Sequence, residues 1–423
     1  MNITALKGFK DILPAEAVLW QRIETTARDV FRRFGFREMK VPILEKTALF
    51  ARSIGETTDI VEKEMYSFVD RNGESLTMRP EGTASVLRAF IEHSLHNQQP
   101  VQKLFTLGPM FRHERPQKGR LRQFHQLSVE ALGASQPELD AEIMAMASMV
   151  LTELGLTVSL EINSLGCPHC RPAFNQALFL FLEDKKDALC EDCQRRRLKN
   201  PLRVLDCKSS ACQGHYRTAP SIIGHLCQDC VDHFHTVQAG LKAMGIAYVI
   251  NSFMVRGLDY YTRTTFELLT DTLGAQSAVG AGGRYDGLIN QLGGPDLPGI
   301  GFAMGMERLV LMLQQQETDL VQAPVGLFIA ALGERARPLG FAMAHGLRCL
   351  GQQVLMDYTD SSLKSQMKQS GKQNCRYTLI IGDDEVDKGE ATLRNMATRE
   401  QELIPLPGDI SDWSAMFAQK ILH

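Results

Sequence analysis

The chain has no run of about 18 consecutive apolar residues, which is the length that a membrane-spanning helix needs. It also has no secretory signal, because residues 1–11 show no basic segment followed by an apolar one. Internal repeats and low-complexity tracts are absent as well. We therefore expect a cytoplasmic protein without a membrane partner, and a length of 423 residues predicts about two or three domains.

An excess of basic charge is missing too. The sequence has 46 Lys and Arg against 49 Asp and Glu, a net charge of −3. That balance excludes a chain that is strongly basic as a whole, but it leaves room for local basic patches. Segment 115–122 is such a patch, because four of its eight residues are basic. Clustered cations on a loop suit phosphate ligands.

The glycine-rich segment Gly299–Arg308 lacks two common nucleotide-binding motifs. It does not end in Gly-Lys-Ser/Thr, as a P-loop does, and Gly301 is followed by Gly305 rather than by a glycine three residues on. Its glycines still permit a flat ligand to approach the backbone closely. Arg308 is expected one turn into the helix that follows.

The ten cysteines are unevenly distributed, since eight of them lie in pairs between residues 167 and 230. In a cytosolic chain, paired spacing predicts metal ligands rather than disulfides. Eight thiolates suffice for two structural zinc sites of four ligands each. The pairing stays open, with free thiols as the alternative to metal and with His169, His215 and His225 near enough to substitute. One option joins four of the cysteines and leaves the other four together: Cys190, Cys193, Cys207 and Cys212 against Cys167, Cys170, Cys227 and Cys230.

Hydrophobic periodicity predicts most of the other elements. Helices are expected over 14–34, 83–95 and 305–316. Strands are expected over 36–44, where Pro42 indicates an edge or interface, and over 101–114, 123–133 and 248–270. A linker is expected at 314–324. Beyond it, strands at 325–331, 353–357 and 377–382 alternate with helices at 335–350 and 361–371, which predicts an α/β domain with a largely parallel sheet.

The hairpin formed by 101–114 and 123–133 gathers polar groups on one face. Side chains alternate faces along a strand, so Phe124, Gln126, Ser128 and Glu130 share one face, opposite Leu127 and Val129. Arg112 and Glu114 share a face of the partner strand. If the Leu127 face is buried, the opposite one holds an arginine, two carboxylates, an amide and an aromatic ring. A solvated polar face is the alternative.

The stretch Arg256–Glu267 is the most informative of the chain. Arg256 is charged at any cellular pH and holds a carboxylate or phosphate with a rigid fork of donors. Tyr260 and Tyr261 suit a small amphipathic ligand. A structural ion-pair cluster is the alternative, because such networks imitate active sites. We assign no catalytic role to Asp259, and orienting Arg256 is its simplest explanation.

The turn Arg79–Thr83 leads into the second predicted helix, with Thr83 as a plausible N-cap. The Glu81 carboxylate at this turn either caps the helix or binds the ammonium group of a ligand. Taken alone, the position favours capping.

Together these motifs resemble a known enzyme family. Phe111–Glu114, the loop 115–122, Arg122–Gln126 and Gly301–Arg308 look like motifs 2 and 3 of class II aminoacyl-tRNA synthetases, and Phe36–Phe50 is similar to motif 1. The stretches 256–267 and 79–83 resemble the two signatures of histidyl-tRNA synthetases in particular. The resemblance covers essentially the whole chain, with the motifs in the right order.

The resemblance implies an α+β catalytic domain, an antiparallel sheet flanked by helices, over residues 1–163 and 246–318. A Cys-rich domain is inserted at 164–245 and is expected to contact the tRNA acceptor arm. The C-terminal α/β domain at 324–423 would bind the anticodon.

The implied function is that of a histidine–tRNA ligase. Such an enzyme activates L-histidine with ATP and Mg²⁺ to histidyl-adenylate and transfers histidine to the 3′ end of tRNA(His), as a homodimer formed through motif 1. The main alternative is the non-catalytic paralogue that regulates an ATP phosphoribosyltransferase, which typically lacks the C-terminal domain. A zinc-stabilised nucleic-acid-binding protein without catalysis is a third possibility, but it would leave four residues without a purpose: Arg112, Glu130, Arg256 and Arg308.

The resemblance also implies residue roles. The α-amino group of histidine would be held by Glu81, Thr83 and Gln126, and its imidazole by Glu130 and Tyr261, with Tyr260 lining the pocket. ATP would contact Arg112 at the α-phosphate, Arg308 at the γ-phosphate, and Glu114 and Phe124 at the adenine. Arg256 and Arg112 would be catalytic, with Arg256 bridging the histidine carboxylate and the α-phosphate. The tRNA acceptor end would contact the loop residues Arg115, Gln117, Lys118 and Arg120.

Overall fold

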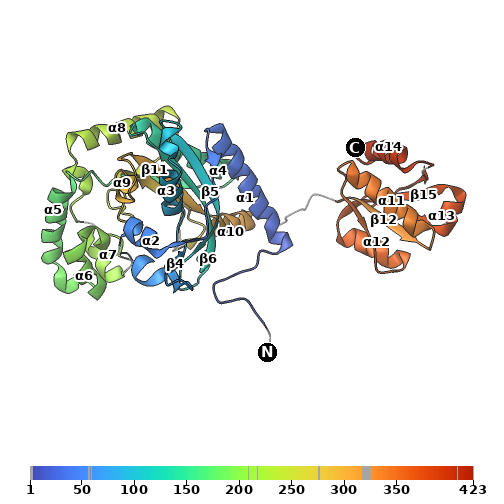
Figure 1. Cartoon of the computed structure of the whole chain (residues 1–423), viewed down its shortest axis with the longest axis horizontal. Helices are drawn as coiled ribbons and strands as arrows, with labels where there is room; N and C mark the ends of the chain where they lie inside the picture. The colour runs from blue at the N-terminus through green and yellow to red at the C-terminus, as the bar shows by residue number, and fades with distance from the viewer. Residues whose placement is uncertain are drawn as a thin grey trace. The chain divides into compact units, whose positions relative to one another are not determined.

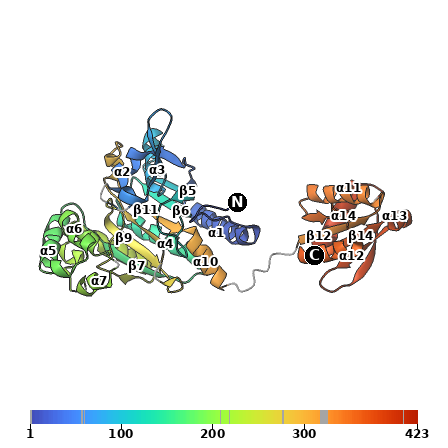
Figure 2. The ribbon, with the colours of Figure 1, turned by 90° about the horizontal axis from the view of Figure 1, so that it is seen from below.

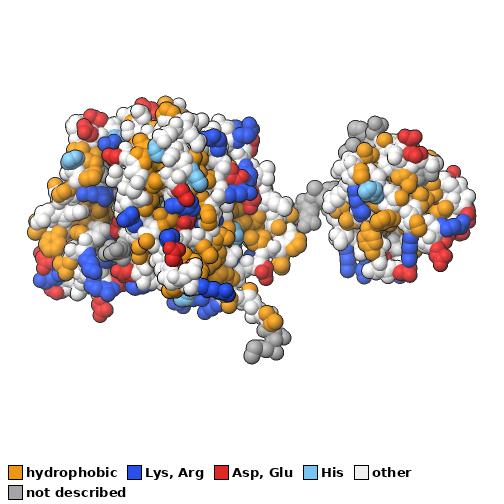
Figure 3. Space-filling model, in the orientation of Figure 1, with side chains coloured by type: hydrophobic (Ala, Val, Ile, Leu, Met, Phe, Trp, Pro, Cys, Tyr) orange, Lys and Arg blue, Asp and Glu red, His pale blue; other side chains and the backbone are white. Residues whose placement is uncertain are grey.

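The computed structural model describes residues 3–422 except 56–57, 59, 208, 217, 275–276, 317–324 and 407. The chain divides into two compact units, residues 1–318 and 319–423, which are considered one at a time (Figure 1). Within the described residues no helix has the length and apolar character needed to cross a membrane. On the face shown in Figure 3, acidic and basic side chains are interspersed over both units, in keeping with the net charge of −3.

An eight-stranded sheet forms the centre of the first unit, in the order β1-β5-β6-β11-β10-β9-β7-β8. Its inner neighbours pair antiparallel, while the two edge pairs, β1 with β5 and β7 with β8, are parallel. The predicted antiparallel sheet flanked by helices is thus confirmed. The strands are β1 (Arg37–Glu38), β5 (Gln102–Phe111), β6 (Gln123–Leu132), β7 (Ser159–Ser164), β8 (Val249–Ile250), β9 (Thr262–Leu269), β10 (Ala278–Arg284) and β11 (Gly299–Gly305).

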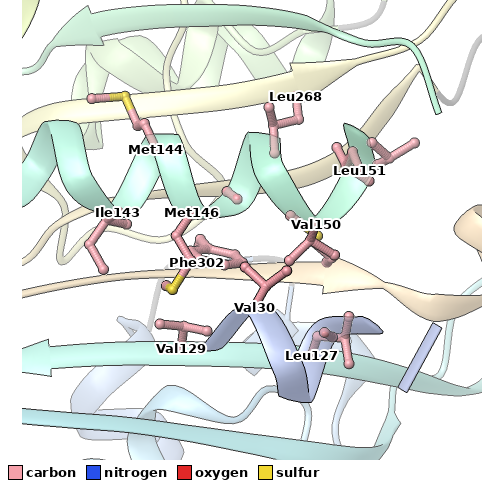
Figure 4. Close-up of a cluster of buried hydrophobic side chains, with 14 of the residues drawn as sticks. Val30, Leu127, Val129, Ile143, Met144, Met146, Val150, Leu151, Leu268 and Phe302 are labelled. Atoms are coloured by element: carbon pink, nitrogen blue, oxygen red, sulfur yellow. The ribbon is translucent and has the colours of Figure 1, made fainter. Parts of the chain in front are cut away.

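Helices cover one face of this sheet and form the main core. They are α1 (Pro14–Arg33), α4 (Pro137–Glu153), α8 (Gln228–Ala243) and α10 (Met306–Gln316). Figure 4 shows Val30 of α1 and Val150 of α4 meeting Val129 and Phe302 of the sheet. Removing each such side chain from water stabilises the fold by about 1.5–3 kcal/mol. The helices expected over 14–34 and 305–316 are therefore present as α1 and α10, although Val18 of α1 is 41% exposed.

The start of α1 follows from its sequence. Pro14 occupies the first turn, where its missing N–H costs no hydrogen bond, and Gly35 follows the helix at φ +79°, a conformation that favours glycine. Leu19, Ile23 and Ala27 are spaced so that they lie on one face, and all three are buried.

A second, three-stranded sheet has the order β2-β4-β3, with β2 (Leu44–Lys46), β3 (Tyr66–Val69) and β4 (Ser75–Met78). The single strand expected over 36–44 was wrong, because the chain passes from β1 to β2 through residues 39–43 around Pro42, which cannot donate to a strand partner. Two helices accompany this sheet, α2 (Thr47–Ile54) and α3 (Thr83–Glu92).

Between β7 and β8 the chain forms a helical segment with its own small core of Phe174, Leu178, Leu182, Val204 and Ile222. Its helices are α5 (Arg171–Glu183), α6 (Glu191–Lys199), α7 (Ser210–Tyr216) and α8. In both ribbon views α5, α6 and α7 lie together, and Figure 2 shows them beside the β9 and β7 end of the sheet.

The second unit is a five-stranded sheet in the order β13-β12-β14-β15-β16. Only β12 with β13 and β12 with β14 are parallel, so the largely parallel sheet expected from the sequence is instead mixed. The sequence prediction missed β15 and β16, in which few residues are apolar and only Ala391, Leu393 and Ile404 are buried. The strands are β12 (Val325–Leu332), β13 (Val354–Met356), β14 (Cys375–Gly382), β15 (Glu390–Asn395) and β16 (Gln401–Pro405).

The helices of this unit are α11 (Ala336–Cys349), α12 (Leu363–Lys372), α13 (Asp383–Lys388) and α14 (Ile410–Leu422). The first two agree with the helices expected at 335–350 and 361–371. Of the linker expected at 314–324, residues 314–316 belong to α10 and the rest lies outside the described residues.

Candidate active site

A cavity of about 460 Å³ lies against the first unit's large sheet. Its wall comes from β6, β10 and β11, from the start of α3 and from the stretch that precedes β9. Most of the site residues expected from the sequence line it: Glu81, Thr83, Arg112, Glu114, Arg120, Phe124, Gln126, Arg256, Tyr260, Tyr261 and Arg308. The two signature stretches, far apart in the sequence, therefore meet at one cavity.

Glu130 lies beneath the cavity, with only 1% of its surface exposed. The Thr83 hydroxyl donates to its Oε1 at 2.6 Å, and the Tyr285 hydroxyl donates to its Oε2. Gly301 on β11 pairs with Glu130, and any side chain there would clash with that carboxylate. Burial raises the pKa of Glu130 to about 8, although both hydroxyls favour the charged form.

The face that Glu130 shares with Ser128 is buried, as is the opposite face with Leu127 and Val129. The solvated polar face considered as the alternative is thus excluded at Ser128 and Glu130. Arg112 and Glu114, in contrast, lie beyond the end of β5 at Phe111, so their strand alternation was wrong although both line the cavity.

Glu81 caps helix α3. Its carboxylate accepts from the backbone N–H groups of Thr83 and Ala84, both at 2.8 Å. Gly82 is the residue at the N-cap position, so the expectation of Thr83 as N-cap was wrong; Thr83 opens the helix and points its hydroxyl at Glu130. Burial raises the pKa of the Glu81 carboxyl.

Arg256 reaches the cavity from the segment before β9. Its guanidinium forms an ion pair with Glu267 of β9 and lies 5.6 Å from the centre of the Tyr261 ring. The Tyr260 ring lies 4.7 Å from that of Tyr261 and 5.8 Å from that of Tyr285. The Arg256 side chain therefore makes a structural ion pair and also lines the cavity.

Two polar atoms at the cavity wall are buried without a hydrogen-bond partner among the described residues: Gln126 Oε1 and Arg256 Nε. A buried polar group without a partner costs stability, so such atoms call for an explanation. One is an acceptor and the other a cationic donor, which suits a ligand that carries both an ammonium and a carboxylate.

The opposite end of the cavity is aromatic and cationic. The Arg112 guanidinium lies 5.2 Å from the centre of the Phe124 ring, and its Nε donates to Pro80 O at 2.9 Å. Arg308, in the first turn of α10 rather than one turn in, donates to Gly119 O at 3.3 Å and to Ala278 O. Backbone acceptors thus aim both arginines at the cavity.

Residues of the loop between β5 and β6 line two different cavities. Gln117 and Arg120 exchange backbone hydrogen bonds of 3.0 and 2.9 Å, and Arg120 pairs with Glu114 at the main cavity. Gln117 and Lys118 instead line a second cavity of about 180 Å³ beside Trp20. Arg115 is exposed.

Asp259 does not pair with Arg256, which corrects the expectation. Its Oδ1 accepts from Arg203 Nη2 at 2.8 Å and from Asn200 Nδ2 at 3.1 Å. Both partners come from the helical segment between β7 and β8, so Asp259 connects that segment to the Arg256–Glu267 stretch at the cavity.

Sequence reasoning missed three residues of the site: Tyr285, Glu267 as a partner of Arg256, and Asp206 at the cavity wall. Tyr285 follows the glycine-rich β10, where a lone aromatic side chain was the available signal. A further buried cluster, in which Asp140 accepts from Arg284 and contacts His233 at 2.8 Å, joins α4, β10 and α8 away from the cavity wall.

The eight cysteines form two groups that could each hold a metal ion, with the sulfurs of a group within 4.8 Å of one another. The grouping is the option put forward from the sequence. We call Cys167, Cys170, Cys227 and Cys230 the neck cluster, and Cys190, Cys193, Cys207 and Cys212 the knuckle cluster. Four converging thiolates are the donor set that structural zinc prefers.

Comparisons with known proteins agree with this geometry. Residues 8–309 match the family model described as histidyl-tRNA synthetase, and residues 327–408 match that of an anticodon binding domain. The chain is 58% identical to a histidine–tRNA ligase of Desulfotalea psychrophila, over 99% of this chain and 97% of that protein. It is also 58% identical to one of Geobacter sulfurreducens, over 96% and 97%.

A solved structure is similar as well. The crystal structure of apo S. aureus histidyl-tRNA synthetase superposes with a TM-score of 0.82 at 36% identity, covering 98% of this chain and 100% of that one.

Proposed function

The chain belongs to the histidyl-tRNA synthetase family and is a histidine–tRNA ligase, and we propose which role each site residue has in that reaction. The cavity takes histidine at the end with Glu130 and Tyr261 and the Mg²⁺ salt of ATP at the end with Phe124. The observation that carries this assignment is the pair of unpartnered buried atoms, Gln126 Oε1 and Arg256 Nε, at the wall between the two ends.

Histidine recognition rests on complementary polar groups. An imidazole presents two ring nitrogens, which Glu130 and Tyr261 can satisfy together. The α-amino group would lie near Glu81, Thr83 and Gln126, where the Gln126 oxygen is available to accept. A ligand that lacks the amino and carboxylate groups would leave Gln126 Oε1 and Arg256 Nε without partners, which is a basis for rejecting it.

ATP binding rests on the other end of the cavity. The Phe124 ring offers a face to the adenine, with Glu114 beside it, and the stacking of a base on an aromatic ring contributes about 1–3 kcal/mol. Arg112 and Arg308 supply positive charge for the α- and γ-phosphates. Their hydrogen bonds to backbone oxygens support this role, because they limit the directions in which the guanidinium groups can point.

The first step joins two anions. A histidine carboxylate oxygen attacks the α-phosphorus, a P–O bond forms, and pyrophosphate leaves. Arg256 and Arg112 stabilise the charge that accumulates at the phosphorus, and their fixed positions limit the reorganisation needed. In the second step the 3′-terminal hydroxyl of tRNA attacks the carbonyl carbon and AMP leaves.

The tRNA contacts extend the proposal. Residues 1–163 and 246–318 would form the catalytic domain, 164–245 and the loop residues Arg115, Gln117, Lys118 and Arg120 would meet the acceptor arm, and 324–423 would bind the anticodon. The exposure of Arg115, Gln117 and Lys118 and the match of 327–408 to an anticodon-binding model support this division.

Three further assignments accompany it. The neck and knuckle clusters would each hold one structural zinc ion, because four thiolates form a closed site. The motif 1 region would form a homodimer, for which the exposed Ile43, Leu44, Phe68 and Val69 offer apolar surface. The enzyme would act in the cytoplasm.

The regulatory paralogue is the weaker alternative, since relatives that match over nearly the whole chain are named histidine–tRNA ligases. Transfer of labelled histidine to purified tRNA separates the two. We expect charging of tRNA(His) and not of other tRNAs, whereas a folded protein that charges none would support the paralogue.

A further inference from the structure

The helical segment between β7 and β8 touches the histidine end of the cavity at two places, and a thiolate cluster lies beside each. The neck cluster joins the two points where the chain enters and leaves the segment, since Cys167 and Cys170 precede α5 and Cys227 and Cys230 begin α8. The knuckle cluster joins the start of α6 to the chain before and within α7.

The first contact comes from Arg171, the residue directly after Cys170. Its guanidinium donates to the backbone oxygen of Tyr261 and, at 3.5 Å, to that of Leu165. Next to it, Gly166 O accepts from Arg263 N at 2.9 Å. Gly166 has φ +62°, and a Cβ there would lie 2.7 Å from Cβ of Cys170. The neck cluster therefore sits directly against the backbone that carries Tyr261.

The second contact comes from the chain between the second and third cysteines of the knuckle cluster. This connection carries Asn200 and Arg203, which both donate to Asp259, and Asp206, which lines the cavity beside Cys207. The Arg203 side chain is 14% exposed and the Asp259 side chain 30% exposed, so the ion pair between them is partly shielded from water. Breaking it from one side costs less than in a fully buried pair but removes the cation with which Asp259 pairs.

The thiols of the knuckle cluster make weak contacts with their neighbours. Cys190 Sγ lies 3.8 Å from Cys207 Sγ, and the backbone N–H of Cys190 donates to Cys212 Sγ at 3.2 Å. Metal–thiolate bonds are far stronger than these contacts, so an ion fixes residues 190–212 much more firmly than the thiols alone would.

We propose that the two metal-loaded thiolate sites hold the Arg256–Tyr261 stretch in its histidine-binding position, through Arg171 at Tyr261 and through Arg203 at Asp259. Arg171 and Arg203 are positioning residues, since they act through the stretch and not on the substrate. The proposal rests on the assigned histidine site. It adds that histidine binding and metal retention are coupled, and such a coupling has the same size in both directions.

Substitution of Arg203 tests the coupling through the knuckle. In ATP–pyrophosphate exchange, Arg203→Ala is expected to raise KM for histidine about tenfold, the effect of one lost charged hydrogen bond, and to leave KM for ATP unchanged. Arg203→Lys should recover part of the loss, because it keeps the charge. Arg195→Ala is the matched control, because Arg195 pairs with Asp192 on the same helix at an exposed site. Unchanged histidine KM in Arg203→Ala with metal still bound would overturn the proposal.

Release of metal from the full-length enzyme provides a readout without catalysis. Zinc loss to a colorimetric chelator is measured with and without saturating L-histidine, and with D-histidine at the same concentration as the control, because D-histidine chelates free zinc equally well. We expect L-histidine alone to slow the release severalfold and Arg203→Ala to remove that protection. Equal rates in all three conditions, or a purified enzyme without metal, would overturn the proposal. If wild-type enzyme showed no exchange while histidine still slowed release, the assigned function would fail and the coupling would stand.

Discussion

The hydroxyl of Thr83, at the start of α3, donates to the carboxylate of Glu130 on β6 at 2.6 Å. With Tyr285 on the other oxygen, this bond fixes a buried acid under a cavity that Arg256 and Arg112 face. The carboxylate can thus keep one geometry whether or not a ligand is bound. The predictions below follow from that arrangement and from the two thiolate clusters.

Replacing Glu130 by Gln should weaken histidine binding. The amide keeps the shape but cannot ionise, so it offers one accepting oxygen instead of two. Either the imidazole or the Tyr285 hydroxyl then loses its hydrogen-bond acceptor. We expect KM for histidine in ATP–pyrophosphate exchange to rise about 100-fold, or roughly 3 kcal/mol, with KM for ATP nearly unchanged. Glu142→Gln, which loses a pair with Lys103 on the face of the sheet opposite to Glu130, is the control.

The raised pKa of Glu130 predicts how stability depends on pH. Burial raises this pKa to about 8 from 4.5, so the folded chain binds the proton more tightly than the unfolded chain does. Stability of the histidine-free enzyme should therefore fall as the pH rises from about 5 to about 8, by up to about 1.4 kcal/mol per pH unit. Thermal unfolding at a series of pH values measures this dependence, and the unfolding temperature of Glu130→Gln should depend less on pH than that of the wild type. If the unfolding temperatures of the two proteins depended on pH in the same way, the raised pKa of Glu130 would be contradicted.

Phe124→Ala should affect ATP selectively. Removing the ring removes the surface on which the adenine would stack, and we expect KM for ATP to rise about tenfold or more. The histidine KM should change little, because Glu130 and Tyr261 are untouched. Phe124→Trp serves as the control that keeps an aromatic face; if it lost ATP binding as fully as the alanine variant, stacking would not be the interaction concerned.

Metal content should follow the grouping of the thiolates. Elemental analysis of the purified enzyme is expected to give about two zinc ions per chain, from four thiolates per site. Cys193→Ser and Cys230→Ser should each reduce this to about one, because they belong to different clusters. Cys349→Ser should leave it at two, since Cys349 is exposed in the second unit. A wild-type sample without metal would refute both sites.

The sequence was most informative where a regular strand carries the site. The alternation from Phe124 to Glu130 predicted that face because side chains in a strand repeat every second residue. It could not place Arg112 and Glu114, since β5 ends before them and a loop has no such period. The cysteine spacing predicted metal ligands and offered the grouping, but only the folded chain, which brings the four sulfurs of each group together, distinguished this grouping from the others.

Long-range partners were beyond the sequence. Asp259 was expected beside Arg256, its near neighbour in the chain, yet its partner Arg203 lies 56 residues earlier, in the helical segment between β7 and β8. Tyr285 was missed because it follows the glycine-rich strand β10. That strand has no amphipathic pattern from which the direction of the Tyr285 side chain could be predicted. In the second unit, β15 and the edge strand β16 were missed because mostly polar strands resemble loops in composition.

Histidine-dependent exchange of labelled pyrophosphate into ATP tests the central claim most directly, because it reports the first step alone and needs no tRNA. With Mg²⁺ present we expect exchange with histidine and none above background with the other amino acids. Arg256→Lys should lower the rate of exchange about 100-fold, because a lysine cannot present the fork of donors that would contact both the histidine carboxylate and the α-phosphate. No histidine-dependent exchange by the folded wild-type enzyme would contradict the account.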